Sequence, residues 1–258
     1  MVYKWQITIP QLSGSQPRSA YIYLPDGWSK KSGQRYPVLY MFDGHNLFFE
    51  EDATYGKSWG LQEYMEKSRT QMIIAAVECS HDPDNGRLSE YSPYTFDNPQ
   101  YGHVVGRGQT TMEWLINVFK PEIDRRFPTL PDRRHTFIAG SSMGGLMSLY
   151  AVTKYNHVFS RAAALSPSLW VAPRKLHWLL RNAPLDRGTV VYMDCGSKEL
   201  GGNSQRIALY NRTAELLASR KIALTSRIVP GGTHNEASWQ KQIPFFMNTL
   251  LYETDDRR

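Results

Sequence analysis

Short apolar runs alternate with amphipathic stretches along most of the chain. Eight of these runs are rich in β-branched and aromatic residues and have the length of strands. The first two lie close together, as an antiparallel hairpin requires, and from the third onward amphipathic helical stretches separate them. Strands that alternate with helices imply a mostly parallel sheet with helices on both faces. The predicted strands are residues 4–9, 20–24, 38–42, 72–77, 136–139, 162–165, 190–194 and 225–229.

The intervening helical stretches carry apolar stripes that suit burial against this sheet. In the longest one, Trp114, Val118 and Phe119 fall on one stripe and predict a core-facing surface. Pro121 lies inside the same stretch and is expected to kink or restart the helix, because proline has no N–H to donate. The predicted helices are residues 58–69, 110–127, 143–154, 173–181, 204–220 and 236–251.

One segment breaks this alternation. Residues 79–109 are rich in Pro, Gly, Asn and Tyr and show no regular periodicity. Structureless connections of that length inside a compact domain are usually lids or binding loops. We therefore expect this segment to border a functional site.

Composition limits the class of protein. A chain of 258 residues with 41% hydrophobic residues can bury one sizeable core, so residues 1–258 are predicted to form a single α/β domain. The net charge is +6, but the basic residues are scattered in short pairs, and no nucleic-acid motif is present. No apolar stretch reaches the length of a membrane span. The sequence thus predicts neither a nucleic-acid partner nor a membrane, and it carries no pattern that reports an oligomeric state.

The two cysteines, Cys79 and Cys195, belong to no CxxC or zinc-type cluster. Such sparse usage suits a reducing compartment. The first residues alternate polar and apolar side chains without the apolar core of a signal peptide. These observations predict a cytoplasmic protein, with no metal and no cofactor.

The sharpest chemical signal is residues 137–145, FIAGSSMGG, which contain the spacing Gly140-x-Ser142-x-Gly144. This nucleophile-elbow pattern occurs where a predicted strand ends and a helix begins, which is the context that the elbow requires. Small flanking residues let strand and helix approach, and the helix dipole favours negative charge near the serine. A phosphate-binding loop is the alternative, but no Lys follows in P-loop fashion. Ser142 is the predicted nucleophile, rather than Ser141, whose frame lacks the glycines.

A serine alcohol needs a histidine base, and the α/β-hydrolase order along the chain is serine, acid, histidine. His234 follows the last predicted strand in a flexible turn and is the predicted base. His157 at a helix end and His177 within a helix are read as structural. The acid should follow the seventh strand, where Glu199 lies in the loop and Asp194 ends the strand. We favour Glu199, because a loop carboxylate reaches the histidine turn more easily, and Asp194 stays an alternative.

Acyl transfer also needs two backbone N–H donors for the oxyanion. Met143, directly after the nucleophile, is predicted to supply one. Gly44 follows the third strand, so the backbone N–H of His45 is predicted to supply the second, although Asp43-Gly44 could simply be a turn. A metal site that combines His45 and Asn46 with His81 and Asp82 is the other interpretation of this region, but their spacing fits no metal pattern.

Several motifs together resemble the putative esterase (esterase D-like) family of α/β-hydrolases, which includes feruloyl and enterochelin esterases. The resemblance implies an α/β-hydrolase fold and a metal-independent hydrolase of carboxylic esters. In feruloyl esterases the acid lies in a Gly-x-x-acid step, and residues 196–199 match that step with Glu in place of the commoner Asp. The matching segments are residues 40–48 (YMFDGHNLF), 87–93 (RLSEYSP), 120–124 (KPEID), 165–170 (LSPSLW) and 232–239 (GTHNEASW), beside the elbow.

The acyl group of the substrate is less clearly indicated. Asn46, Phe48, Tyr91 and Trp170 are predicted substrate contacts, in a cleft for a feruloyl- or acetyl-type ester of a sugar or another small ester. These aromatics could equally pack the long segment onto the core. Three further alternatives stay open: a siderophore trilactone esterase, which the positive charge suits; an acyltransferase; and a binding protein on a hydrolase scaffold.

Overall fold

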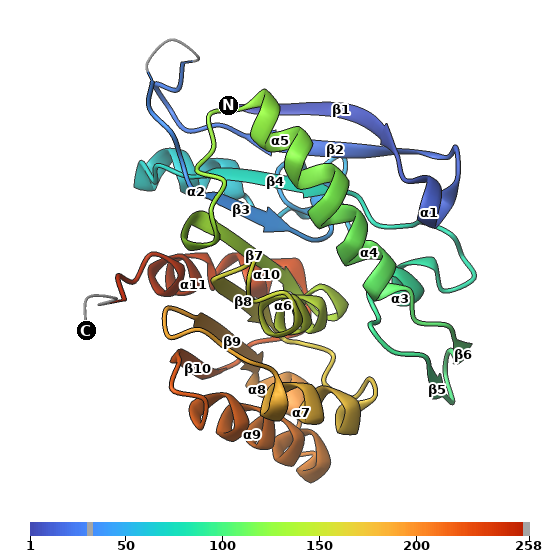
Figure 1. Cartoon of the computed structure of the whole chain (residues 1–258). Helices are drawn as coiled ribbons and strands as arrows, with labels where there is room; N and C mark the ends of the chain where they lie inside the picture. Colours follow the sequence, from blue (N-terminus) through green and yellow to red (C-terminus); the bar gives the residue numbers. More distant parts are fainter. Residues whose placement is uncertain (30–32, 255–258) are drawn as a thin grey trace.

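The computed structural model describes residues 1–29 and 33–254, and an eight-stranded sheet is its central feature (Figure 1). The first two strands pair antiparallel with each other, the second strand (Pro17–Tyr23) is antiparallel to the fourth (Ile73–Val77), and all other pairs in this sheet are parallel. The predicted mostly parallel sheet with an antiparallel start is therefore confirmed. In spatial order its strands are β1 (Val2–Thr8), β2 (Pro17–Tyr23), β4 (Ile73–Val77), β3 (Val38–Met41), β7 (Thr136–Ser141), β8 (Arg161–Leu165), β9 (Val190–Gly196) and β10 (Ala223–Val229).

Helices cover both faces of this sheet, as the alternation of strands and helices predicts (Figure 1). The predicted terminal helix, residues 236–251, is in fact two helices that meet at residues 241–242. One face carries α4 (Gly108–Trp114), the π-helical turn η2 (Leu115–Phe119), α5 (Lys120–Arg126), α6 (Met143–Lys154), α7 (Pro173–Asn182) and α9 (Ser204–Ala218). The other face carries α2 (Leu61–Ser68), α10 (Glu236–Gln240) and α11 (Ile243–Leu250). Short helices join them: α1 (Pro10–Ser13), η1 (Gly44–Asn46), α3 (Gly86–Glu90), η3 (Arg133–His135) and α8 (Ser197–Leu200).

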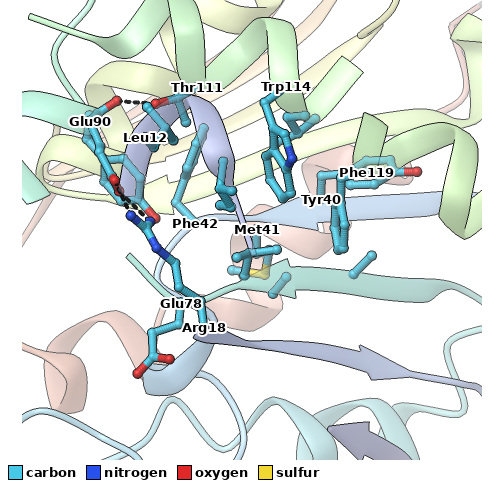
Figure 2. A pocket seen from close by; sticks show the side chains of 16 residues that line it. Leu12, Arg18, Tyr40, Met41, Phe42, Glu78, Glu90, Thr111, Trp114 and Phe119 are labelled. Atoms are coloured by element: carbon cyan, nitrogen blue, oxygen red, sulfur yellow. Dashed lines mark hydrogen bonds and ion pairs between the residues drawn. The ribbon is translucent and has the colours of Figure 1, made fainter. Parts of the chain in front are cut away.

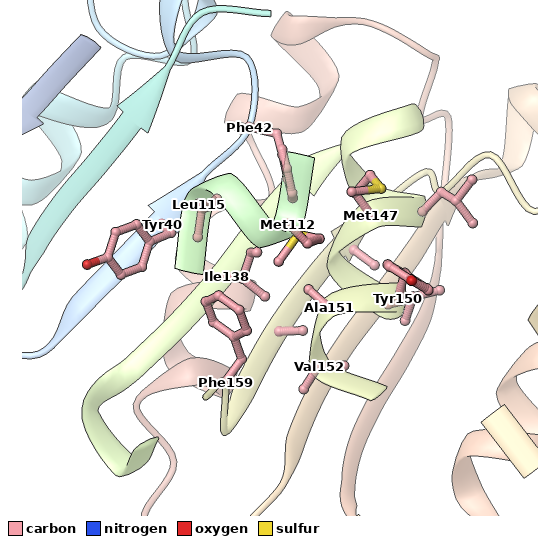
Figure 3. Close-up of a cluster of buried hydrophobic side chains, with 14 of the residues drawn as sticks. Tyr40, Phe42, Met112, Leu115, Ile138, Met147, Tyr150, Ala151, Val152 and Phe159 are labelled. Carbon is pink, nitrogen blue, oxygen red and sulfur yellow. The ribbon is translucent and has the colours of Figure 1, made fainter. Parts of the chain in front are cut away.

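The sheet separates two hydrophobic cores because successive side chains of a strand point to opposite faces. In β3, Tyr40 belongs to the core under α4–α6, whereas Leu39 and Met41 belong to the core under α2 and α11. Figure 3 shows the first core, where Tyr40 and Ile138 from the sheet meet side chains of the covering helices. Both faces of the central strands are buried, which explains their nearly continuous apolar sequences.

The predicted long helix runs from α4 through η2 into α5 without leaving helical backbone angles. The wider π turn lies directly before Pro121, the residue that cannot donate a backbone hydrogen bond. A π turn shifts the phase of the apolar stripe. Trp114 and Phe119 are buried as predicted, but Val118 is 46% exposed, so its assignment to the core-facing stripe was wrong.

The prediction that residues 79–109 are structureless was wrong. The segment contains α3 and a small hairpin of β5 (Phe96–Asn98) and β6 (Gly102–Val104). Glu90 anchors it: its carboxylate accepts a hydrogen bond of 2.7 Å from Nη1 of Arg18, and its carbonyl accepts one of 2.8 Å from Thr111 (Figure 2). Arg18 and Glu90 are both buried. The cavity beside this ion pair holds about 30 Å³, which is room for about one water molecule and not for a substrate.

Within the described ranges, no helix combines the length and the apolar character that crossing a membrane would require.

Candidate active site

Ser142 lies in the sharp turn between β7 and α6, at the carboxyl edge of the sheet. Its backbone angles are φ 57° and ψ −119°, a conformation that side-chain-bearing residues rarely adopt. The turn is held where the Ser142 N–H donates to the carbonyl of Leu165 over 2.9 Å. A Cβ on Gly140 would lie 2.8 Å from the backbone carbon of Gly144, so strand and helix approach too closely for larger residues. The local geometry is that of a nucleophile elbow.

His234 lies in the turn after β10 and reaches over to this serine. Its Nε2 is 2.9 Å from Ser142 Oγ, which is hydrogen-bonding distance. The other two downstream histidines lie elsewhere: His157 is exposed, and His177 on α7 bonds Thr213 Oγ1 at 3.0 Å. Of the three histidines that follow the elbow, His234 is therefore the one that the fold brings to Ser142.

Glu199 lies on α8, directly after β9. Its Oε2 is 2.6 Å from Nδ1 of His234, and its Oε1 accepts the Gly196 N–H at 2.9 Å. This second bond is one half of a capping box, because Glu199 is the third residue of α8. Capping thus fixes the carboxylate on the side of the loop that faces the histidine turn. Ser142, His234 and Glu199 form one continuous hydrogen-bonded chain.

Asp194, the alternative acid, is buried and hydrogen-bonded within the fold. Its Oδ1 accepts the Ser166 N–H at 3.1 Å, and its Oδ2 accepts the Tyr192 hydroxyl at 2.7 Å. The side chain is only 1% exposed at the end of β9. Both carboxylate oxygens are therefore engaged inside the fold, away from the histidine ring.

The two carboxylates differ in charge behaviour. Burial tends to raise the pKa of Glu199, but hydrogen bonds from His234, Ser166 and Gly196 outweigh it and leave that pKa below its usual value. Burial raises the pKa of Asp194 to about 6, despite the hydrogen bonds from Tyr192 and Ser166. Glu199 is therefore the carboxylate kept ionised next to the histidine.

The acid and base loops are tied directly to each other. The Lys198 N–H donates to the Gly232 carbonyl over 3.1 Å, and the Gly231 N–H donates to Ser197 Oγ over 2.9 Å. A Cβ on Gly196 would meet the Gly232 oxygen at 2.3 Å, so only glycine fits where the loops cross. These contacts hold His234 and Glu199 in fixed relative positions.

The two predicted oxyanion donors belong to neighbouring helix starts. Met143 is the first residue of α6, and His45 lies in the first turn of η1, where backbone N–H groups have no partner inside their own helix. A Cβ on Gly144 would lie 3.0 Å from Phe42 Cβ, so the elbow and the loop after β3 are adjacent. This adjacency supports the predicted pair of donors.

A buried ion pair shapes the loop after β3. Asp43 has a left-handed backbone, with φ 56°, and its two carboxylate oxygens accept Arg87 Nε at 2.7 Å and Nη2 at 2.6 Å. Its own N–H donates to the Tyr91 hydroxyl over 3.1 Å. Burial favours neutral Asp43, but the Arg87 guanidinium outweighs burial and lowers its pKa. Asp43 therefore forms a fixed turn that directs the chain into His45.

The side chain of His45 is engaged elsewhere, because its Nε2 bonds Thr54 Oγ1 at 3.0 Å. Only its backbone N–H is the predicted oxyanion donor. Among the described residues, the groups with metal-ligating atoms within 4.8 Å of one another are Asp43, His45 and Cys79, and His45, Glu78 and His81. The second group contains His45 and His81 of the alternative interpretation, but not Asp82. Asp43 is committed to Arg87, Glu78 Oε1 to His81, and the His45 and His81 rings pack edge to face at 5.1 Å. We assign no metal to this cluster.

A cleft of about 680 Å³ opens beside His234 and Glu199. Trp170 lines it, is 42% exposed, and stacks on Tyr101 with ring centroids 6.1 Å apart. Phe48 and Tyr91 do not fit their predicted place in this cleft. Phe48 is buried in the α2/α11 core against Tyr21, and Tyr91 is buried against Phe42. Both rings therefore pack the hydrophobic interior and do not line the cleft.

Asn46 has a local structural bond. Its side-chain oxygen accepts the Thr54 N–H at 2.9 Å, which closes the loop that follows η1. A contact with substrate stays a prediction for this residue.

Three residues that contact the candidate triad were missed by sequence reasoning, among them Ser168, whose Oγ lies 3.4 Å from Ser142 Oγ. Ser166 Oγ donates to Glu199 Oε1 over 2.7 Å, and the Trp239 ring packs edge-on against His234 with centroids 5.0 Å apart. Ser166 follows an apolar strand at the same sheet edge as Ser142, and that position was the available signal. Trp239 is the last residue of the matching segment 232–239, and that position was the available signal for it.

The elevated pKa of Asp194 predicts a pH-dependent stability. Its pKa is about 6 when folded, against roughly 3.9 when unfolded, so the native state binds more protons between these values. Stability from this group is therefore lost as pH rises through that window. Relative to wild type, Asp194→Asn should gain on the order of 3 kcal/mol between pH 4 and pH 7. Urea unfolding at both values measures this, with exposed Asp84→Asn as control; a pH-independent difference would refute it.

The comparisons with known proteins place the chain in one family. The putative esterase family model matches residues 13–247. The uncharacterized protein YbbA of Bacillus subtilis is 27% identical over 242 residues, which cover 89% of each chain. The endo-1,4-beta-xylanase/feruloyl esterase of Xylanibacter ruminicola is 22% identical over 95% of this chain, which spans only 31% of that relative.

Solved structures share the fold. The siderophore hydrolase EstA from Aspergillus nidulans superposes with a TM-score of 0.70 at 20% identity, over 96% of this chain and 94% of the other. At 20% identity this structural similarity supports the fold and nothing further. Together with the family match over most of the sequence, it establishes an α/β-hydrolase fold. The chain belongs to the putative esterase family of serine hydrolases.

Proposed function

We propose that this protein hydrolyses carboxylic esters through an acyl-enzyme formed on Ser142. The observation that carries the proposal is the hydrogen-bonded chain from Ser142 Oγ through His234 to Glu199, with distances of 2.9 Å and 2.6 Å. In that order a nucleophile, a base and an orienting acid have the arrangement that acyl transfer uses.

Each residue has a defined part in the reaction. Nε2 of His234 takes the proton of Ser142 while Oγ bonds to the ester carbonyl carbon, and the backbone N–H groups of Met143 and His45 stabilise the resulting oxyanion. The imidazolium then protonates the leaving alcohol as the ester C–O bond breaks. A water molecule, deprotonated by the same nitrogen, hydrolyses the acyl-enzyme and restores Ser142. Glu199 holds the ring orientation and stabilises the imidazolium throughout.

For the substrate we propose a small ester with an aromatic acyl group, such as a feruloyl ester of a sugar. The exposed Trp170 face stacked on Tyr101 offers a flat apolar wall within the cleft beside His234. Aromatic rings stack favourably on such a wall, whereas an acetyl group would leave it uncovered. Simple acetyl esters fit the same chemistry and would be turned over more slowly.

A siderophore lactone is the second candidate, because the cleft also carries positive charge. Lys198 and Arg206 line it on the α8–α9 side, and the chain has a net charge of +6. Cationic groups beside aromatic rings would attract an anionic catecholate. Hydrolysis rates on a catecholate trilactone and on a feruloyl sugar ester distinguish the two substrates.

The test compares feruloyl and acetyl esters of one sugar in wild type and Trp170→Ala. We expect wild type to prefer the feruloyl ester, and Trp170→Ala to lower kcat/KM about fivefold for that ester alone, since a stacked ring contributes about 1 kcal/mol. Trp178→Ala removes an equally large exposed ring on α7 and is the matched control. Equal rates on both esters in wild type would refute the aromatic substrate, and a catecholate preference would favour the siderophore.

A further inference from the structure

Ser166 occupies an unusual position behind the acid of the candidate triad. It follows β8 directly, is 4% exposed, and has a left-handed backbone with φ 44°. Its hydroxyl lies between two partners: it is 2.7 Å from Glu199 Oε1 and 3.0 Å from the indole nitrogen of Trp239. A serine in such a strained conformation is retained only where its surroundings hold it.

The direction of these two hydrogen bonds is fixed by chemistry. The indole N–H of Trp239 can only donate, so it uses a lone pair of Ser166 Oγ. The single hydroxyl proton of Ser166 is then free to point only toward the carboxylate. Glu199 Oε1 receives this proton together with the Gly196 N–H, and Oε2 is left for His234 Nδ1.

The backbone of Ser166 is held from below. Its N–H lies 3.1 Å from Asp194 Oδ1 and 3.1 Å from the Asp194 carbonyl, and the Tyr192 hydroxyl fixes the other oxygen of Asp194. This carboxylate, which sequence reasoning weighed as the catalytic acid, therefore supports the residue that bonds the acid. The same Trp239 also packs its ring against His234.

We propose that Trp239 and Ser166 form a positioning relay that locks the Glu199 carboxylate with Oε2 toward His234. Trp239 orients the hydroxyl of Ser166, and that hydroxyl prevents the carboxylate from rotating away from the base. Neither residue hydrogen-bonds Ser142 or His234, so both are positioning residues. The inference rests on the proposed esterase mechanism.

The relay has a pH signature. Without the Ser166 hydroxyl, Glu199 has one donor fewer and the Glu199–His234 pair holds a proton more tightly, so the acid limb of the kcat/KM profile moves to higher pH. The other titratable and charged groups around the Glu199–His234 pair include Asp194, Cys195, Lys198, Arg206 and Glu236, and none of these is changed in these variants.

Trp239→Phe removes the N–H and keeps a ring, and Ser166→Gly removes the hydroxyl while tolerating the positive φ. We expect each to lower kcat about tenfold with KM nearly unchanged, and to move the acid limb up by on the order of half a pH unit. Because Trp239 acts through Ser166, adding Trp239→Phe to Ser166→Gly should cost less than about twofold more. Trp59→Phe, the same change to the indole that packs on Trp239, should keep both kcat and the profile.

Two results would overturn the relay: single variants with wild-type kcat and pH profile, or losses that multiply in the double variant. Thermal unfolding of each variant shows whether it is folded, and Ser166→Gly alone carries the pH test if Trp239→Phe unfolds. A wild-type protein without activity on any ester would instead refute the proposed function. The two failures are therefore distinguishable.

Discussion

Replacing Ser142 with alanine is expected to lower kcat on an activated aryl ester by about 10⁵- to 10⁶-fold. Alanine cannot form the acyl-enzyme, so only the oxyanion donors and substrate binding would remain to accelerate the reaction. The fold should be retained, because alanine adds no strain to a backbone that already has φ 57° with a serine. Steady-state rates with circular dichroism of the same samples give the result.

The matched control is the neighbouring serine. Ser141 is 5% exposed at the end of β7, and its hydroxyl has no part in the hydrogen-bonded chain to Glu199. Ser141→Ala should stay within a few-fold of wild type. If the folded Ser142→Ala variant kept substantial turnover while Ser141→Ala lost it, the assigned nucleophile would be the wrong serine.

The second large effect is expected at Glu199. A glutamine there keeps the size of the side chain, but its amide NH2 can donate a hydrogen bond to Nδ1. That bond favours the tautomer of His234 with the proton on Nε2, which cannot accept the proton of Ser142. Glu199→Gln should therefore lower kcat by on the order of 10⁴. Asp194→Asn should cost far less, because Asp194 reaches the triad only through the backbone of Ser166.

Pre-steady-state kinetics with an aryl ester separate acylation from deacylation in both variants. A triad with Glu199 predicts that both steps slow in Glu199→Gln, since His234 serves as base in each. Small and equal losses in the two variants would contradict that assignment and indicate a Ser142–His234 dyad. A greater loss in Asp194→Asn would transfer the role to the deeper carboxylate.

The sequence predicted those parts of the fold that local patterns control. Apolar runs with turn signals at their ends predicted every strand of the main sheet to within a few residues, and the mostly parallel pairing followed from the helices between them. The position of Ser142 could be predicted because Gly140 and Gly144 flank it with the spacing of a nucleophile elbow. His234 and Glu199 were found by their order after the strands, and the structure puts both within hydrogen-bonding reach of the same site.

What the sequence could not predict depends on burial and on long-range contacts. Phe48 and Tyr91 are aromatic, as a binding wall would be, yet both are buried: Phe48 packs against Tyr21 and Tyr91 against Phe42. The 79–109 segment looked structureless because its stability comes from Glu90, which pairs with Arg18 across 72 positions of sequence. Ser166 and Trp239 form a hydrogen bond across 73 positions of sequence, and no local pattern predicts that these two residues pair.

An activated Ser142 is the group on which the proposed reaction depends. Incubation with a fluorophosphonate, followed by intact-mass measurement and peptide mapping, tests it directly, because such reagents trap serines that a histidine base activates. We expect one phosphonyl group per chain, located on Ser142, with no labelling of Ser142→Ala and much slower labelling of His234→Ala. Undiminished labelling of Ser142→Ala, or a phosphonyl group mapped to another residue, would contradict it.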